Sequence, residues 1–303
     1  MPIDLITILG PTASGKTSIA SQLARDFNGE IISADSRQVY RGMDIGTGKD
    51  IFEFQKHNIK YHLIDIIEPF EEYNLFRFTK DFQLAIEKIK IDNKLPVLVG
   101  GTGLYISAIL QSYILPEMDD EEVKELSLLT FSQLKEILVK QKPKLHNVTD
   151  LTDKDRILRA ILIERSRAKP QQIIPELKSL NIGIKPTREE TKRRITKRLK
   201  HRLASGMIEE AKRLLSKGVS KEKMEYFGLE YKFVSQYVEG KLNYNDMFQK
   251  LNSAIHSFAK RQMTWFRKME KEGVVINWFP TDSYPEIRKF VKSLLSNAES
   301  LPD

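Results

Sequence analysis

One short glycine-rich segment, residues 10–17, constrains the fold of this chain more than any other feature. It fits the pattern G-x-x-x-x-G-K-[ST], in which backbone N–H groups and a lysine surround phosphate groups. Its residues are Gly10, Pro11, Thr12, Ala13, Ser14, Gly15, Lys16 and Thr17. The apolar run Leu5–Leu9 precedes it, and apolar residues at helical spacing follow it from Ile19 to Phe27. Strand, loop and helix in this order predict a di- or triphosphate site at a helix N-terminus.

Two side chains of this loop carry chemistry of their own. Lys16 would place a positive charge on the phosphates, and the Thr17 hydroxyl would bind Mg²⁺. The loop does not determine whether the phosphates belong to ATP, to GTP or to a ligand that is not a nucleotide. A glycine-rich βα turn with a chance Lys-Thr pair is the alternative interpretation.

The first half of the chain alternates strand and helix patterns, which is typical of a parallel sheet with crossover helices. We expect strands at 30–34, 62–66 and 96–99, and helices at 76–91 and 104–111. Asp35 and Thr102 each follow a strand, and carboxyl ends of parallel strands share one edge of a sheet. The predicted fold is therefore an α/β fold similar to the P-loop-containing nucleoside triphosphate hydrolases, with both residues near the phosphate loop.

The pattern changes near Pro116. Residues 117–180 show helical periodicity and no further strand signal, and a strand pattern returns at 181–184. This order predicts a helical insertion, residues 116–180, in a catalytic core made of residues 1–115 and 181–303. Helices are expected at 207–217, 229–238 and 245–270, followed by a strand at 274–278 and a helix at 284–295.

Basic residues gather in a predicted helix that begins at Thr187. Residues 188–202 hold eight Lys and Arg side chains against Glu189 and Glu190, and the whole chain of 303 residues has a formal net charge of +8. The interleaved Ile195 and Leu199 favour a helix that packs on one side and faces phosphates on the other, although a solvated face is the simpler alternative. A polyanionic partner, nucleic acid or an acidic membrane, fits this charge.

The composition excludes several classes of protein. The absence of cysteine excludes disulfides, thiolate catalysis and cysteine-ligated zinc. Apolar runs stay well short of the roughly 18 residues of a membrane span, and the N-terminus lacks the layout of a signal peptide. We therefore expect a cytoplasmic protein without a membrane partner.

Asp35 is the main candidate for catalysis because it directly follows an apolar strand. Beside a phosphate loop, a carboxylate can orient an acceptor hydroxyl or a Mg²⁺-bound water, or accept a proton from nitrogen. A loop-capping role is the alternative. Asp65 also ends an apolar run and could act as a Walker B acid. His57 and His62 have no second histidine at metal-ligand spacing, so we interpret them as surface or core residues.

Three blocks of sequence resemble the tRNA dimethylallyltransferases, also called tRNA isopentenyltransferases. They are the loop 10–17, the segment 33–47 (Ser-Ala-Asp-Ser-Arg-Gln-Val-Tyr-Arg-Gly-Met-Asp-Ile-Gly-Thr) and the segment 99–105 (Val-Gly-Gly-Thr-Gly-Leu-Tyr). Further matches lie at 153–159, 206–210 and 259–267, so the resemblance spans nearly the whole chain. The segment 33–47 is far more specific for this family than the phosphate loop is.

The resemblance implies an enzyme with a P-loop-kinase-like fold and a helical insertion. Such an enzyme transfers a dimethylallyl group, with Mg²⁺, from dimethylallyl diphosphate to N6 of adenine 37, beside the anticodon of certain tRNAs. The loop 10–17 would bind the diphosphate, mainly through Thr12 to Thr17, with Lys16 and a Mg²⁺ ion on Thr17 neutralising its charge, and Asp35 would be the general base. The residues expected at the tRNA are Asp35, Ser36, Arg37, Gln38, Thr102, Lys124, Asp155, Arg156, Ile157, Leu158, Arg159 and Arg261. A monomer is expected.

Two segments depart from the family pattern. Glu225 stands where the family usually has an arginine before an Ile-Gly-Tyr turn, and Ile255-His256 replace the usual Thr-Arg. Two other functions remain as alternatives: a P-loop small-molecule kinase that uses ATP, and a nucleic-acid-binding module whose loop only anchors a phosphate. A comparison of ATP with dimethylallyl diphosphate, each added with Mg²⁺, would distinguish these functions by which ligand shifts the melting temperature.

Overall fold

The computed structural model describes residues 3–113, 115–116, 120–141, 154–166, 171–172 and 176–299. The chain divides into two compact units, Met1–Gln111 with Glu176–Asp303, and Ser112–Pro175. We call them the core unit and the inserted unit. The sequence-based boundaries at 116 and 180 lie a few residues later than these divisions.

A six-stranded sheet forms the centre of the core unit, in the order β3-β2-β4-β1-β7-β8, and every pair of neighbours is parallel. Its strands are β1 (Leu5–Leu9), β2 (Gly29–Ala34), β3 (Tyr61–His62), β4 (Leu95–Gly100), β7 (Ser179–Ile184) and β8 (Asn277–Phe279). The central strands are buried on both faces, as near-continuous apolar runs require. The predicted α/β fold is confirmed.

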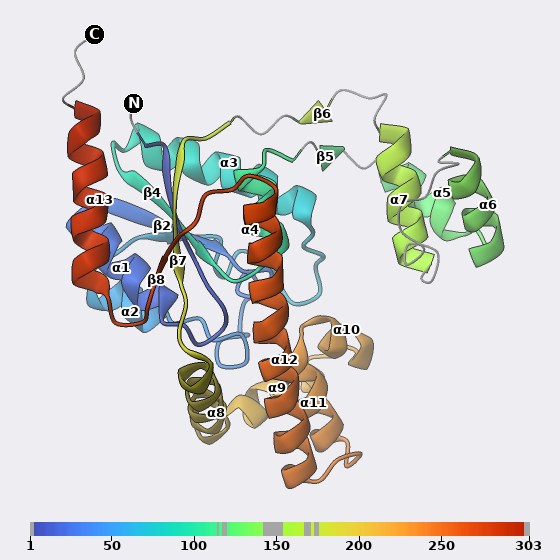
Figure 1. Ribbon diagram of the computed structural model, residues 1–303. Helices are drawn as coiled ribbons and strands as arrows, with labels where there is room; N and C mark the ends of the chain where they lie inside the picture. Colours follow the sequence, from blue (N-terminus) through green and yellow to red (C-terminus); the bar gives the residue numbers. More distant parts are fainter. Residues whose placement is uncertain are drawn as a thin grey trace. The chain divides into compact units, whose positions relative to one another are not determined.

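Helices cover both faces of this sheet (Figure 1). On one face lie α1 (Lys16–Asp26), α2 (Ile51–Lys56) and α13 (Tyr284–Glu299), and on the other lie α3 (Leu75–Ile91) and α4 (Gly103–Leu110). Leu23 of α1 and Ile287 of α13 are fully buried in the same cluster as the β1 and β4 side chains. The layers therefore hold the carboxyl ends of the strands fixed.

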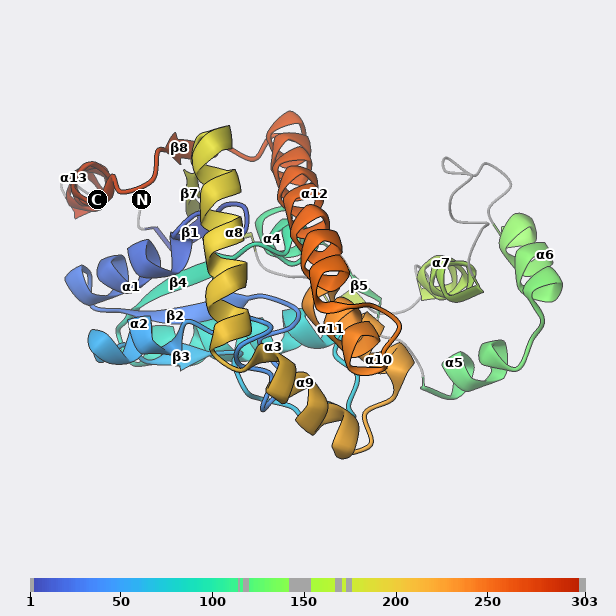
Figure 2. The same ribbon diagram turned by 90° about the horizontal axis from the view of Figure 1, so that it is seen from below.

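Five helices extend beyond the carboxyl edge of the sheet. They are α8 (Arg188–Ala204), α9 (Met207–Ser216), α10 (Lys221–Tyr226), α11 (Leu229–Val238) and α12 (Tyr244–Lys271). A capping box formed by Thr187 and Glu190 starts α8. Helices α8 and α12 lie side by side (Figure 2). The short α2 and α10 have no counterpart in the sequence-based prediction, because six residues give too few turns for a periodic pattern.

The inserted unit contains α5 (Asp120–Ser127), α6 (Phe131–Gln141) and α7 (Lys154–Ser166). Its own small core is formed by Leu126, Leu134, Leu138, Ile157, Ile161 and Leu162. The expectation of no strand in this region was wrong, since β5 (Leu115–Pro116) pairs antiparallel with β6 (Gln171–Gln172). Two-residue strands are too short to show the alternation that identifies a strand.

The third strand is also shorter than expected. It ends at His62, because Leu63 and Asp65 have φ of 62° and 56°, in the left-handed region where a strand cannot continue. Among the helices that the structure describes, we find none with the length and apolarity to span a bilayer.

Candidate functional site

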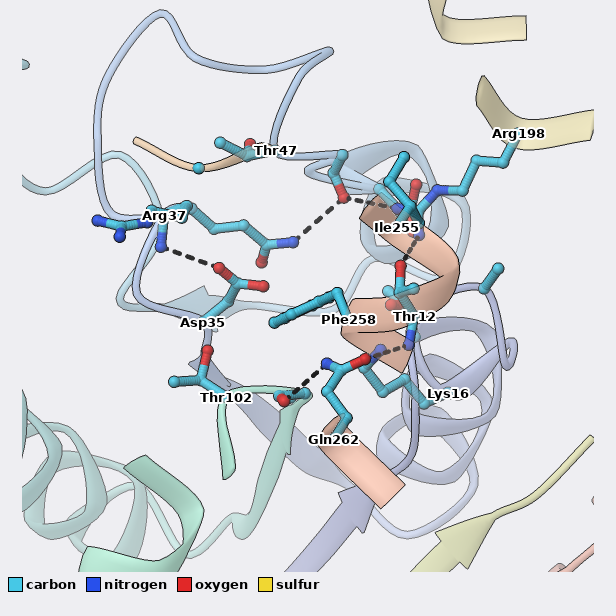
Figure 3. A pocket seen from close by; sticks show the side chains of 18 of the residues that line it. Thr12, Lys16, Asp35, Arg37, Thr47, Thr102, Arg198, Ile255, Phe258 and Gln262 are labelled. Atoms are coloured by element: carbon cyan, nitrogen blue, oxygen red, sulfur yellow. Dashed lines mark hydrogen bonds and ion pairs between the residues drawn. The ribbon is translucent and has the colours of Figure 1, made fainter. Parts of the chain in front are cut away.

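A cavity of about 1210 Å³ lies in the core unit, where the strands end. Its walls come from the phosphate loop, the segments after β2 and β4, the loop 46–48, and the helices α8 and α12 (Figure 3). Segments far apart in the sequence therefore converge at the edge predicted from the strand pattern.

The phosphate loop forms one wall of the cavity. Thr12, Ala13, Gly15, Lys16 and Thr17 line it, whereas Gly10, Pro11 and Ser14 are not among the lining residues. Gly10 must be glycine, because a Cβ there would lie 2.6 Å from the carbonyl oxygen of Ile184. Gly15 has φ of 86° and directly precedes α1, so the loop turns sharply into the helix N-terminus.

The loop has free hydrogen-bond donors. Within the described part of the chain, the backbone N–H groups of Ala13, Gly15, Lys16 and Thr17 have no acceptor. The Lys16 ammonium lies 3.4 Å from the carbonyl oxygen of Pro11. Burial, together with the charge of Arg198, lowers the pKa of Lys16 to about 8. An anion bound here would gain free N–H donors and a cation with little competing solvent.

Arginines of α8 add positive charge to the same wall. Arg193, Arg194, Arg198 and Arg202 all line the cavity. Nη1 of Arg198 lies 3.4 Å from Oγ1 of Thr12 in the phosphate loop. Nη1 of Arg202 donates to the carbonyl oxygen of Gly46 and to Oε1 of Glu230, both at 3.2 Å. The charge run of the sequence, which includes Arg193 and Arg198, thus has a face that lines the cavity.

Asp35 lines another side of the cavity, near Arg37 and Thr102 (Figure 3). Its Oδ1 accepts the backbone N–H of Arg37 at 2.9 Å, which is the contact of a loop-capping aspartate. Oγ1 of Thr102 accepts the backbone N–H of Ser36 at 3.4 Å. The carboxylate therefore both caps its loop and faces the cavity, so these two roles are compatible.

The loop 42–48 is held by a buried carboxylate from α9. Glu210, only 1% exposed, accepts the backbone N–H groups of Asp44, Ile45 and Gly46 at 2.7, 2.8 and 2.9 Å. Its fourth donor is the Tyr231 hydroxyl at 2.7 Å, whose pKa is raised by burial and by the carboxylate. We call this arrangement the Glu210 clamp. It fixes Gly46, Thr47 and Gly48 in the cavity wall.

Helix α12 supplies lining residues that sequence reasoning missed. Phe258, Gln262 and Trp265 all face the cavity. Gln262 forms hydrogen bonds to both the phosphate loop and the segment after β4. The segment 259–267 was noted only as a family match, because nothing local indicates which face of a long helix meets a loop some 250 residues away.

The other residues expected at tRNA fall into two groups. Ser36, Arg37, Gln38 and Arg261 line the cavity of the core unit. The Arg37 guanidinium lies 4.3 Å above the ring centroid of Tyr226, and that of Arg261 lies 5.9 Å from the ring centroid of Phe258. Both pairs place a cation on an aromatic face.

The second group belongs to the inserted unit. The side chains of Lys124, Asp155, Arg156 and Arg159 lie outside the described residues. Ile157 is fully buried in the small core of that unit and Leu158 packs against it. The Ile157 side chain therefore helps to hold the unit together, and a contact of this residue with tRNA stays a prediction.

Several alternatives from the sequence find no place in the cavity. Asp65, the candidate Walker B acid, is ion-paired with the buried Lys49 and is not a lining residue. His62 contacts Glu30 at 2.7 Å. The described residues hold no group of three or more His, Asp or Glu side chains arranged to bind a metal.

The two departures from the family pattern differ in position. Glu225 is paired with Lys232 at 3.0 Å, away from the lining, whereas Ile255 lines the cavity. Partial burial, with Lys192 and Lys260 nearby, lowers the pKa of His256. At neutral pH this position therefore lacks the charge that an arginine would supply.

The fold and the cavity define a P-loop protein with a carboxylate and several arginines around one cavity. The family model described as IPP transferase matches residues 38–269, and that described as Isopentenyl transferase matches residues 3–65.

Individual relatives match over nearly their full length. tRNA dimethylallyltransferase 2 of Citrifermentans bemidjiense is 50% identical over 284 residues, which cover 93% of this chain and 92% of the relative. tRNA dimethylallyltransferase 1 of Geotalea uraniireducens is 51% identical over 288 residues, covering 94% and 95%. The crystal structure of the full-length tRNA isopentenylpyrophosphate transferase of Bacillus halodurans superposes with a TM-score of 0.71 at 32% identity, covering 97% of both chains.

The chain therefore belongs to the tRNA dimethylallyltransferase, or IPP transferase, family. Its class is that of enzymes that transfer prenyl groups, and the comparisons favour this class over the small-molecule kinase.

Proposed function

We propose that this protein transfers a dimethylallyl group from dimethylallyl diphosphate to N6 of adenine 37 in tRNA, giving N6-(dimethylallyl)adenosine. The main support for the proposal is that the phosphate loop and Asp35 line the same cavity. One wall offers free N–H donors, Lys16 and Arg198 to a diphosphate. Another offers a carboxylate to the nucleophile.

The proposed reaction forms one bond to carbon, breaks another, and transfers one proton. The N6 nitrogen bonds to C1 of the prenyl group while the C1–O bond breaks and its electron pair leaves with the diphosphate. The proton lost from N6 passes to the Asp35 carboxylate, which acts as general base. Lys16, Arg198 and the loop N–H groups stabilise the negative charge that grows on the leaving group.

Mg²⁺ fits this site through oxygen ligands. The cavity presents the Thr17 hydroxyl beside Lys16, and Mg²⁺ commonly takes few protein ligands together with substrate phosphates. We propose that Thr17 helps to hold the ion, which would neutralise part of the diphosphate charge.

We propose that tRNA contacts both units. Ser36, Arg37, Gln38, Thr102 and Arg261 would contact it at the cavity, and Lys124 and the segment 155–159 would contact it from the inserted unit. Adenine must leave its stack to reach Asp35, so a flipped base is expected. The net charge of +8 supports binding to a polyanion.

A tRNA substrate implies action in the cytoplasm. We further propose that the protein acts as a monomer.

A transfer assay tests the proposed function. The protein, labelled dimethylallyl diphosphate, Mg²⁺ and bulk tRNA are incubated, and the tRNA is digested to nucleosides. Label in N6-(dimethylallyl)adenosine is expected with the wild type, and no label when Asp35→Asn replaces the wild type for the same short time. Label on a small molecule, or dependence on ATP, would contradict the proposal.

A further inference from the structure

Gln262 joins two loops at the base of the cavity. Its Oε1 accepts the backbone N–H of Thr12 at 2.8 Å, and its Nε2 donates to the carbonyl oxygen of Gly101 at 2.8 Å (Figure 3). The residue is 6% exposed, so both bonds lie in a poorly solvated place. The Gln262 amide thus connects the phosphate loop to the segment that follows β4.

This contact removes one donor from the phosphate loop. The N–H groups at Gly15, Lys16 and Thr17 point out of the start of α1 without an acceptor among the described residues, whereas that of Thr12 is already taken. Thr12 lies at the end of the loop opposite the helix start. The donors left for a ligand are therefore the N–H of Ala13 and those at the helix N-terminus.

The Gln262 amide also fills space beside Lys16. A Cβ added to Gly101 would lie 2.5 Å from Nε2 of Gln262 and 3.5 Å from Nζ of Lys16, so the amide and the ammonium are near neighbours. In loops of this sequence pattern the lysine reaches the β- and γ-phosphates of a nucleoside triphosphate. The amide thus lies beside the lysine, where we infer that a third phosphate would be placed.

We propose that Gln262 restricts the loop to a diphosphate and excludes triphosphates, so that it determines specificity for the donor against cellular ATP and GTP. It acts by occupying the Thr12 N–H and by filling the space next to Lys16. The inference rests on the proposed function, since it assigns a diphosphate to this loop.

Binding of inorganic diphosphate and inorganic triphosphate to the protein tests the inference without tRNA. Dissociation constants are measured by calorimetry with magnesium at about 0.15 M salt, where weak surface binding is screened. The wild type should bind triphosphate at least about tenfold more weakly than diphosphate, despite the greater charge of triphosphate. In Gln262→Ala the ratio of the triphosphate dissociation constant to the diphosphate dissociation constant should fall by about tenfold or more. This is the scale of one hydrogen bond to a charged group.

Gln262→Met is the matched control, because it keeps the length of the side chain but accepts no hydrogen bond. If the ratio of the two dissociation constants changes only in Gln262→Ala, the side chain excludes triphosphate by filling space. If the ratio changes in both variants, the exclusion depends on the Thr12 N–H that each variant leaves free. An unchanged ratio in both, with melting curves showing folded protein, overturns the inference. So does wild-type affinity for triphosphate equal to that for diphosphate, a result that needs no variant.

The same experiment separates this inference from the proposed function. If the wild type binds neither anion, the phosphate site itself is wrong. The wild type could instead bind diphosphate, with weaker binding in Lys16→Ala, while the Gln262 variants keep the same ratio of the triphosphate and diphosphate dissociation constants. In that case only the role of Gln262 is wrong.

Discussion

At the scale of single residues, Asp35 carries the proposed chemistry. An exocyclic adenine amine is a poor nucleophile, because its lone pair is delocalised into the ring. A carboxylate that accepts its N–H orients the nitrogen and takes the proton as the C–N bond forms. The hydrogen bond from the Arg37 N–H fixes this carboxylate in the cavity wall.

Asp35→Asn should lower the single-turnover rate by about 10²–10⁴-fold, the usual contribution of general-base assistance. The amide keeps the size and can still accept the Arg37 N–H, so donor and tRNA affinities should stay within about tenfold. The measurement is the transfer rate at saturating donor and tRNA. A near-wild-type rate, accompanied by a lower melting temperature, would assign Asp35 to loop capping alone.

Lys16 should make donor binding depend on pH. Its pKa of about 8 in the free protein lies below the ordinary value of 10.5, and a bound diphosphate raises it again. The protonated form binds the donor, so affinity should fall as pH rises above about 8, by up to about tenfold per pH unit.

Donor dissociation constants from pH 7 to 10 check this expectation. Lys16→Arg keeps a cation that does not titrate in this range, so its affinity should not show the fall. Lys16→Ala should bind weakly at every pH. A fall of equal size in the arginine variant would assign the pH dependence to another group.

At the scale of elements, α8, α9 and α12 complete a cavity that the sheet only begins. The sheet edge brings the phosphate loop, Asp35 and Thr102 together, while the helices add arginines, the Glu210 clamp and Gln262. The clamp shows how a helix controls a loop. Four hydrogen bonds converge on one buried carboxylate, and losing an acceptor there leaves buried donors unsatisfied.

Glu210→Gln should destabilise the protein by about 1–3 kcal/mol, because the amide NH₂ faces N–H groups that need an acceptor. The loop 46–48 lines the cavity, so KM for the donor should rise along with the loss of stability. Melting curves and donor KM measure the two effects.

Tyr231→Phe is the control for the clamp. It removes one of the four donors, and its ring still packs against Gly46, where a Cβ would lie 2.5 Å from the Tyr231 ring. The loss of stability and the rise in donor KM should both be clearly smaller in Tyr231→Phe than in Glu210→Gln. Unchanged melting and unchanged KM in Glu210→Gln would show that the clamp does not position the loop.

At the scale of the whole molecule, the cavity belongs entirely to the core unit, and the inserted unit has an apolar core of its own. Replacing residues 112–175 by a short Gly/Ser linker should therefore leave a folded protein that binds the donor within a few-fold of the wild type. Affinity for tRNA should fall by about tenfold or more, since proposed phosphate contacts are lost.

Calorimetry with the donor and filter binding with tRNA measure the two affinities. Full-length protein carrying Arg156→Glu and Arg159→Glu is the matched comparison and should lose tRNA affinity while it keeps the inserted unit. Wild-type affinity for tRNA in the shortened protein would rule out a role for this unit in tRNA binding.

Local sequence determined much of the core. The pattern around residues 10–17 identified the phosphate loop, because strand, glycine turn and helix are consecutive. Alternating strands and helices predicted a parallel sheet, and a parallel sheet places residues such as Asp35 and Thr102 at one edge whatever the rest of the chain does. Helix 229–238 was predicted to the residue and α12 to within one residue at each end, since long periodic patterns are the clearest local signal.

Tertiary structure alone decided which distant side chains complete the site. Thr12 and Gln262 are 250 positions apart, and Gly46 and Glu210 are 164 apart, so no local spacing relates them. Their meeting depends on how α9 and α12 pack beyond the sheet edge, which is set by many small apolar contacts and not by any one pattern. The sequence could therefore place the loop 10–17 and Asp35 at one edge of the sheet, while only the packed helices determine which side chains complete the cavity.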